Sequence, residues 1–105
     1  MARGPRSKPA RLGEKLLQIR SALGLSQSEM LERLGLTNVM DYRRISEFEL
    51  GTTEPHLPVL LQYARVARVH MEDLVDDEID LPERIPGTVR YETVERKSVQ
   101  QKRLK

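Results

Sequence analysis

Residues 23–51 read LGLSQSEMLERLGLTNVMDYRRISEFELG and decide the fold of this chain. In their first part, the Ser26 hydroxyl is placed to accept a hydrogen bond from the Glu29 amide, and the Glu29 carboxylate to accept one from the Ser26 amide. This arrangement is a capping box, which starts a helix, and Leu25 and Met30 flank it as a hydrophobic staple. A short helix of about two turns is therefore predicted after Ser26.

A second start signal follows within the same stretch. Asp41 is an N-cap residue type, and Met40 and Ile45 are spaced as the staple of the helix that it would begin. Ile45 and Phe48 lie three residues apart on one face, and Gly51 can end the helix in the left-handed conformation. Two short helices joined by a turn are predicted.

Three further helices are predicted outside this stretch. Apolar residues recur at i, i+4, i+7 and i+11 from Leu12, and Gly24 can end the helix that they indicate. Another helix carries Pro58, which is tolerated in a first turn. A short fifth helix over residues 71–75 precedes an acidic run. The pattern predicts an all-α fold of five helices.

The bulk composition indicates one small helical domain. A chain of 105 residues holds one core, and 38% hydrophobic with 4% aromatic residues makes that core aliphatic. The absence of cysteine excludes disulfides, and no apolar run is long enough to span a bilayer or to form a signal peptide, so a cytoplasmic protein is expected. The expected divisions are a flexible basic arm at 1–10, a domain at 11–80 and a basic tail at 81–105.

Charge is distributed unevenly along the chain. Residues 1–11 hold four basic residues and no acid, and residues 81–105 hold seven basic against three acidic residues, so each end carries +4. Residues 12–80 hold seven basic and thirteen acidic residues, a net charge of −6. Basic ends are typical of polyanion binding, although solvated charge explains them equally well. In the tail, residues 89–93 alternate weakly as a strand would, and the later residues fit either a charged helix or disorder.

Catalytic and metal-binding patterns are missing from the sequence. His56 and His70 lie fourteen residues apart, without the spacing of metal ligands. The acidic run from Asp76 to Asp80 lacks the glycine and the terminal glutamate of a calcium loop, so a solvated acidic face is expected there. There is no glycine-rich phosphate loop and no nucleophilic triad. We therefore expect no catalytic residues, no metal and no cofactor.

Two segments of the chain resemble a known family. The Xre family, the lambda-repressor-like helix-turn-helix proteins, has a helix entry similar to Leu23-Gly24-Leu25-Ser26-Gln27 and a recognition-helix end similar to Ile45-Ser46-Glu47-Phe48-Glu49-Leu50-Gly51. The resemblance extends from Leu12 to about Val75. It implies a compact five-helix domain that places the second helix of its motif in the major groove of double-stranded DNA.

The resemblance also implies which residues contact DNA. Gln27, at the first position of its helix, is expected to contact a phosphate. On the recognition helix, arginine can pair with guanine and glutamate can accept from cytosine. The expected contact set is Gln27, Ser28, Asn38, Tyr42, Arg43, Arg44, Glu47, Thr52 and Thr53, joined by Arg3, Arg6 and Lys8 of the arm. The matching positions in the family further imply an ion pair between Arg20 and Glu49.

Three features depart from the family pattern. The segment from Thr37 to Met40 lengthens the turn before the recognition helix, which leaves the register of that helix open. The loop Thr52-Thr53-Glu54 has no basic residue where the family usually carries basic or amide side chains. Arg68 occupies the place of a helix-ending glycine.

The favoured function is a transcriptional regulator, a repressor on the nucleoid, that binds a palindromic operator as a homodimer. A dimer is expected because one recognition helix is small and because apolar residues remain near the end of the domain: Met71, Leu74, Val75, Ile79 and Leu81. One alternative is an antitoxin-like or adaptor protein whose residues 81–105 bind a protein partner. Another is an architectural protein that binds DNA without sequence preference.

Overall fold

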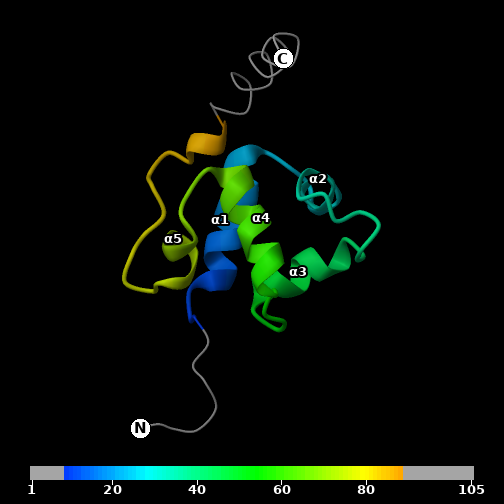
Figure 1. Ribbon diagram of the computed structural model, residues 1–105, viewed down its shortest axis with the longest axis horizontal. Helices are drawn as coiled ribbons and strands as arrows, with labels where there is room; N and C mark the ends of the chain where they lie inside the picture. The colour runs from blue at the N-terminus through cyan, green and yellow to red at the C-terminus, as the bar shows by residue number, and fades with distance from the viewer. Residues whose placement is uncertain (1–8, 89–105) are drawn as a thin grey trace, which may run out of the picture.

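Five helices form the main regular structure in the computed structural model, which describes residues 9–88 (Figure 1). They are α1 (Leu12–Leu23), α2 (Gln27–Arg33), α3 (Arg43–Leu50), α4 (Leu57–Ala67) and α5 (Met71–Val75). The described residues contain no strand. The expected all-α fold is confirmed, and each helix predicted from the sequence is present.

Local signals set the ends of the helices. Ser26 Oγ accepts a hydrogen bond from the Glu29 amide at 3.1 Å, and Glu29 Oε1 accepts one from the Ser26 amide at 2.8 Å, which is the predicted capping box of α2. Gly24 ends α1 and Gly51 ends α3, with left-handed φ angles of 71° and 81°. Arg68 ends α4 at φ 62°, a conformation that is unfavourable for a residue with a Cβ atom.

α1 contacts helices on both sides of the molecule. It packs against α3 and α5, while α2 contacts α3 and α4 contacts α5. In Figure 1, α2 and α3 lie on one side of α1 and α5 lies on the other. Gly13 makes the approach of α1 to α3 possible, because a Cβ atom there would lie 2.6 Å from the carbonyl oxygen of Glu49. α3 is therefore held against the first helix of the domain, and α2 is held against α3.

One aliphatic core joins all five helices. Apart from Phe48 and Tyr63, its buried apolar members have no aromatic ring, as the composition predicts. They are Leu12, Leu16, Ile19, Met30, Leu31, Leu34, Ile45, Phe48, Val59, Leu60, Tyr63, Ala64, Ala67, Leu74, Leu81 and Ile85.

The core continues beyond residue 80, which is the predicted end of the domain. Leu81 and Ile85 are buried, at 6% and 3% exposure. Gly87 is buried as well, and a Cβ atom on it would collide with the backbone of Val66 and Ala67 at the end of α4. The packed body therefore includes residues up to this glycine, because apolar side chains spaced between prolines still reach the core. The expected strand-like pattern at residues 89–93 lies outside the described residues.

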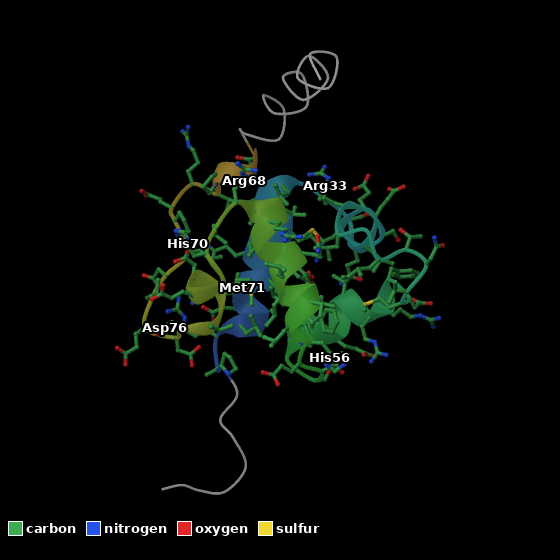
Figure 2. All side chains as sticks on the ribbon, viewed as in Figure 1. Arg33, His56, Arg68, His70, Met71 and Asp76 are labelled. Carbon is green, nitrogen blue, oxygen red and sulfur yellow. The ribbon has the colours of Figure 1, made fainter. Side chains whose placement is uncertain are left out.

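Lys15 is a fully buried cation between α1 and the end of α5. Its Nζ donates hydrogen bonds to the carbonyl oxygens of Asp73, Asp76 and Ile79, at 2.8, 2.8 and 2.6 Å. The last carbonyls of a helix have no partner within the helix, and a cation is favourable beside them. In Figure 2, Asp76 lies in the loop beside α5. Lys15 therefore connects the loop after α5 to α1 through hydrogen bonds.

The acidic run binds the start of α1 and is only partly the solvated face that was expected. The Asp77 carboxylate accepts hydrogen bonds from the amides of Ala10 and Arg11 at 2.8 and 2.9 Å, and these bonds lower the pKa of Asp77. The Arg11 guanidinium donates to the Asp77 carbonyl and to the Asp80 carboxylate. Glu78 and Asp80 remain exposed. The difference from the expectation arises because the chain returns to the amides that precede α1.

Replacing Lys15 by methionine should destabilise the protein by about 3 kcal/mol, because three part-buried carbonyl oxygens lose their donor. The measurement is the free energy of unfolding from urea titration at neutral pH. Gln18→Met, on the exposed side of the same helix, is the matched control and should change stability by less than about 0.5 kcal/mol. Equal unfolding midpoints for the two variants would contradict a structural role for the buried ammonium group.

Candidate nucleic-acid interface

The turn between α2 and α3 spans residues 34–42 and has its own hydrogen bonds. The Leu36 carbonyl accepts from the amides of Val39 and Met40 at 2.9 and 3.1 Å. Leu36 and Met40 pack against the core, whereas Val39 is exposed. The extra residues from Thr37 onward therefore form a closed turn that is anchored to the core at both ends.

α3 begins at Arg43, so the prediction that Asp41 is the N-cap residue is wrong by one position. Tyr42 is the N-cap residue and has helical angles, φ −62° and ψ −23°. Asp41 still caps the first turn, because its Oδ1 accepts from the Arg43 amide at 2.8 Å. The carbonyls of Asp41 and Tyr42 accept from the amides of Arg44 and Ile45, both at 3.0 Å. These i to i+3 bonds tighten the start of the helix.

The first turn of α3 presents polar side chains to solvent. Ile45 and Phe48 face the core. Tyr42 is 48% exposed, and the side chains of Arg43 and Arg44 are 76% and 50% exposed. The residues expected to face DNA from this turn are therefore available at the surface.

Glu47 connects this face of α3 to the loop that follows the helix. Its carboxylate lies 3.5 Å from Arg44 Nη1 and accepts from Thr53 Oγ1 at 3.3 Å. Its carbonyl accepts from the Thr52 amide at 3.1 Å and from Thr52 Oγ1 at 3.3 Å. The two threonines therefore cap the end of α3. Thr52 is exposed to solvent, and Thr53 is half-buried.

Arg20 of α1 and Glu49 of α3 form a bidentate ion pair. Arg20 Nε donates to Glu49 Oε2 at 2.6 Å, and Nη2 donates to Oε1 at 3.0 Å. The side chains are 18% and 6% exposed. The third nitrogen, Nη1, donates to the Leu25 carbonyl at 3.0 Å, in the turn before α2. One guanidinium group thus connects α1, the start of the motif and α3.

Gln27 also reaches this ion pair. Its Nε2 donates to Glu49 Oε1 at 3.4 Å, so the start of α2 lies beside α3. Gln27 is half-buried, whereas Ser28 and Asn38 are exposed, the first on α2 and the second in the long turn. Three residues of the expected contact set lie outside the described residues: Arg3, Arg6 and Lys8.

Tyr63 is a residue of this region that sequence reasoning missed. Its side chain is fully buried, and its hydroxyl has no hydrogen-bond partner among the described residues. Burial, helped by the negative charge of Glu49, raises its pKa, so the phenol stays neutral. The signal was its spacing, since Tyr63 follows Leu60 by three residues and precedes Ala67 by four, which places it on the buried face of α4.

The apolar residues expected to remain for a dimer contact are divided by the structure. Leu74 and Leu81 belong to the core, at 0% and 6% exposure, and are therefore unavailable. The sequence predicts them as surplus because it does not show that the chain returns to α1 after α5. Met71 and Ile79 are half-buried, and Val75 is 37% exposed.

The part of the chain that the structure describes holds no group of three His, Asp or Glu side chains that could bind a metal ion. His56 and His70 lie apart, before α4 and before α5 (Figure 2). None of the helices described is both long and apolar enough to cross a membrane.

Comparison with known protein families places the motif helices within a family. The model of the family described as Helix-turn-helix matches residues 16–74, which is more than half of the chain and reaches from α1 into α5. No curated protein matches the chain. No solved structure matches it either.

Arg20→Ala should destabilise the protein by about 3 to 5 kcal/mol, because it leaves the buried carboxylate of Glu49 without its counter-charge. Thermal and urea unfolding measure the loss, and Arg65→Ala, at an exposed arginine of α4, is the control. The double variant Arg20→Met with Glu49→Met should lose less than the sum of the two single variants, since the charges then disappear together. An unchanged melting temperature in Arg20→Ala would show that the pair adds nothing to stability.

Proposed function

The chain belongs to the helix-turn-helix family, in its lambda-repressor-like or Xre group, and is a DNA-binding regulator; from this premise we propose that it is a repressor that occupies a palindromic operator as a homodimer. Repression then follows from occupancy, because a protein seated on the operator excludes other proteins from that DNA. No chemical step by the regulator is needed.

The observation that carries the proposal is the exposed first turn of α3. It presents two arginines on a short helix that the Arg20–Glu49 pair connects to α1 and that Gln27 connects to α2. A recognition helix must enter the major groove with its first-turn side chains facing the base edges. Side chains held on a rigid helix can do so with little loss of conformational entropy.

The proposed contacts divide into two classes. Arg43 and Arg44 would pair with guanine and Glu47 with cytosine, which sets the sequence preference. Gln27 would contact a phosphate at the start of α2 and set the register, and the exposed or half-buried polar residues around it would add backbone contacts. These further contacts come from Ser28, Asn38, Tyr42, Thr52 and Thr53.

Electrostatics requires positive charge from outside the described body. Residues 9–88 contain nine basic and fourteen acidic residues, a net charge of −5. Such a body is repelled by DNA at long range. The basic ends of the chain supply the compensation in this proposal, with Arg3, Arg6 and Lys8 of the arm as the first candidates.

A homodimer would place two copies of α3 in successive major grooves. Half-sites one turn of DNA apart require a separation of roughly 34 to 36 Å between the two recognition helices. Exposed Val75, with half-buried Met71 and Ile79, supplies the apolar surface that remains for this contact near α5.

A second candidate function is an adaptor whose residues 81–105 bind a protein partner. The acidic body favours it, as does the loop of residues 52–54, which lacks basic side chains. Leu81 and Ile85 belong to the packed core, so the partner-binding part of this candidate is confined to the residues beyond them.

Selection of duplexes from a random pool with the full chain tests the main proposal. We expect one enriched motif with two-fold symmetry, and two chains per duplex in sedimentation at saturating protein. In competition binding, Gln27→Ala should weaken all sequences alike, because a phosphate contact is independent of sequence. A pool without enrichment would favour the adaptor or the architectural protein, and one chain per duplex would rule out the dimer.

Removing residues 1–9 should make binding less dependent on salt, because the deletion removes three positive side chains. Each phosphate contact adds about −0.9 to the slope of log affinity against log salt, so the slope should become shallower by up to about 2 to 3 units. The selected motif should stay nearly unchanged. A full-length variant with Arg3, Arg6 and Lys8 all replaced by glutamine controls for chain length and should behave like the deletion. A slope equal to that of the wild type in both variants would exclude the arm from the interface.

A further inference from the structure

Asp41 makes more contacts at the start of α3 than helix capping requires. Its Oδ1 accepts from the Arg43 amide at 2.8 Å and from Arg43 Nε at 3.2 Å, while its Oδ2 accepts from Arg43 Nη2 at 3.1 Å. The same carboxylate therefore holds the backbone and the side chain of one residue. Because its position is set by the backbone amide, it fixes the guanidinium relative to the helix.

The contacts between the Asp41 carboxylate and Arg43, here called the Asp41 clamp, leave one edge of the guanidinium open. Arginine carries five N–H donors in a rigid plane. Asp41 takes the lateral edge, which consists of Nε and one hydrogen of Nη2. Among the described residues, no hydrogen bond involves Nη1, and the side chain of Arg43 is 76% exposed. The terminal edge, formed by Nη1 and the second hydrogen of Nη2, can still pair with the O6 and N7 atoms of guanine.

Arg44 is held less firmly than Arg43. Its Nη1 lies 3.5 Å from Glu47 Oε1, and that oxygen also accepts a hydrogen bond from Thr53. This is a single long contact to a shared acceptor, whereas Arg43 has a two-point contact. The hydrogen bonds from the Arg43 side chain and amide lower the pKa of Asp41, so the clamp is ionised at neutral pH.

We propose that Asp41 is a positioning residue for DNA recognition, which orients Arg43 so that its terminal edge reads one guanine in each half-site. Arg43 is then the main determinant of sequence preference, and Arg44 contributes less. This inference rests on the proposed function as an operator-binding regulator, and it adds to that function a residue that does not itself touch the bases.

Charge and positioning predict opposite effects for Asp41, which makes the inference testable. An acidic side chain beside DNA opposes binding through its charge. If charge and capping were its whole role, its neutralisation would strengthen binding to every sequence. If it positions Arg43, neutralisation must reduce the preference for guanine, because the guanidinium loses the contact that fixes its plane.

The experiment measures the binding of Asp41→Asn in the full chain to the selected operator and to operators in which one G·C pair per half-site is replaced by A·T. Asparagine preserves the helix cap, since its Oδ1 also accepts from a backbone amide. We expect an unchanged melting temperature and a loss of about fivefold in the preference for guanine at one position. An undiminished preference at every position, with equal or tighter binding, would overturn the proposal.

Two controls separate positioning from other roles. Glu32→Gln removes an equal charge from an exposed site on α2 and should leave the base preference unchanged. Arg43→Lys should lose the same guanine preference as Asp41→Asn, because lysine cannot bind two partners through two edges. In an Arg43→Ala background, Asp41→Asn should have no further effect on preference. A guanine preference that survives in Arg43→Lys would overturn the inference even if Asp41→Asn failed to fold.

The outcomes also distinguish this inference from the function on which it rests. A wild-type chain that selects a two-fold motif, while Asp41→Asn and Arg43→Lys keep all base preferences, refutes the positioning role alone. A wild-type chain that selects no motif refutes the operator-binding function, and the inference falls with it.

Discussion

The position of α3 depends on the part-buried ion pair between Arg20 and Glu49. Its two hydrogen bonds, at 2.6 and 3.0 Å, join the last part of α1 to the last part of α3, and the bond from Arg20 to the Leu25 carbonyl adds the entry to α2. A carboxylate that is 6% exposed needs such a partner, because an unpaired buried charge is costly. α3 and the start of α2 are therefore positioned together.

The other end of α1 is held by different chemistry. Lys15 binds three carbonyl oxygens after and within α5, and Asp77 binds the two amides before α1. These contacts satisfy carbonyl oxygens in and after α5 and amides just before α1. Charged side chains thus connect α1 to the helix-turn-helix motif at one end and to α5 at the other, with the aliphatic core between them. In this arrangement, the side chains on the exposed face of α3 contribute to the fold only by capping that helix.

On that face, each arginine already has an acidic neighbour. Asp41 contacts Arg43, and Glu47 lies beside Arg44, so the surface is close to neutral where a DNA-binding face is commonly positive. Exposed pairs of this kind contribute little to folding. In the proposed function, these pairs orient the arginines for base recognition. The binding energy from phosphate contacts would then come from the basic ends of the chain.

The sequence alone determined the helices and most of their ends, because capping boxes, glycine stops and apolar spacing act between residues close together in the chain. The start of α3 lies one residue later than the sequence predicts. It also indicated the family and the Arg20–Glu49 pair. Only the tertiary structure shows the contacts between segments that are far apart in the sequence. Lys15 lies on the apolar stripe of Leu12 and Ile19, but its hydrogen-bond partners lie about sixty residues later in the chain. Leu81 and Ile85 lie in the segment predicted to be the tail, but in the structure they belong to the core. The Asp41 clamp joins residues that are close in sequence. A carboxylate at a helix start has several possible hydrogen-bond partners, however, and only the folded structure shows which of them it binds.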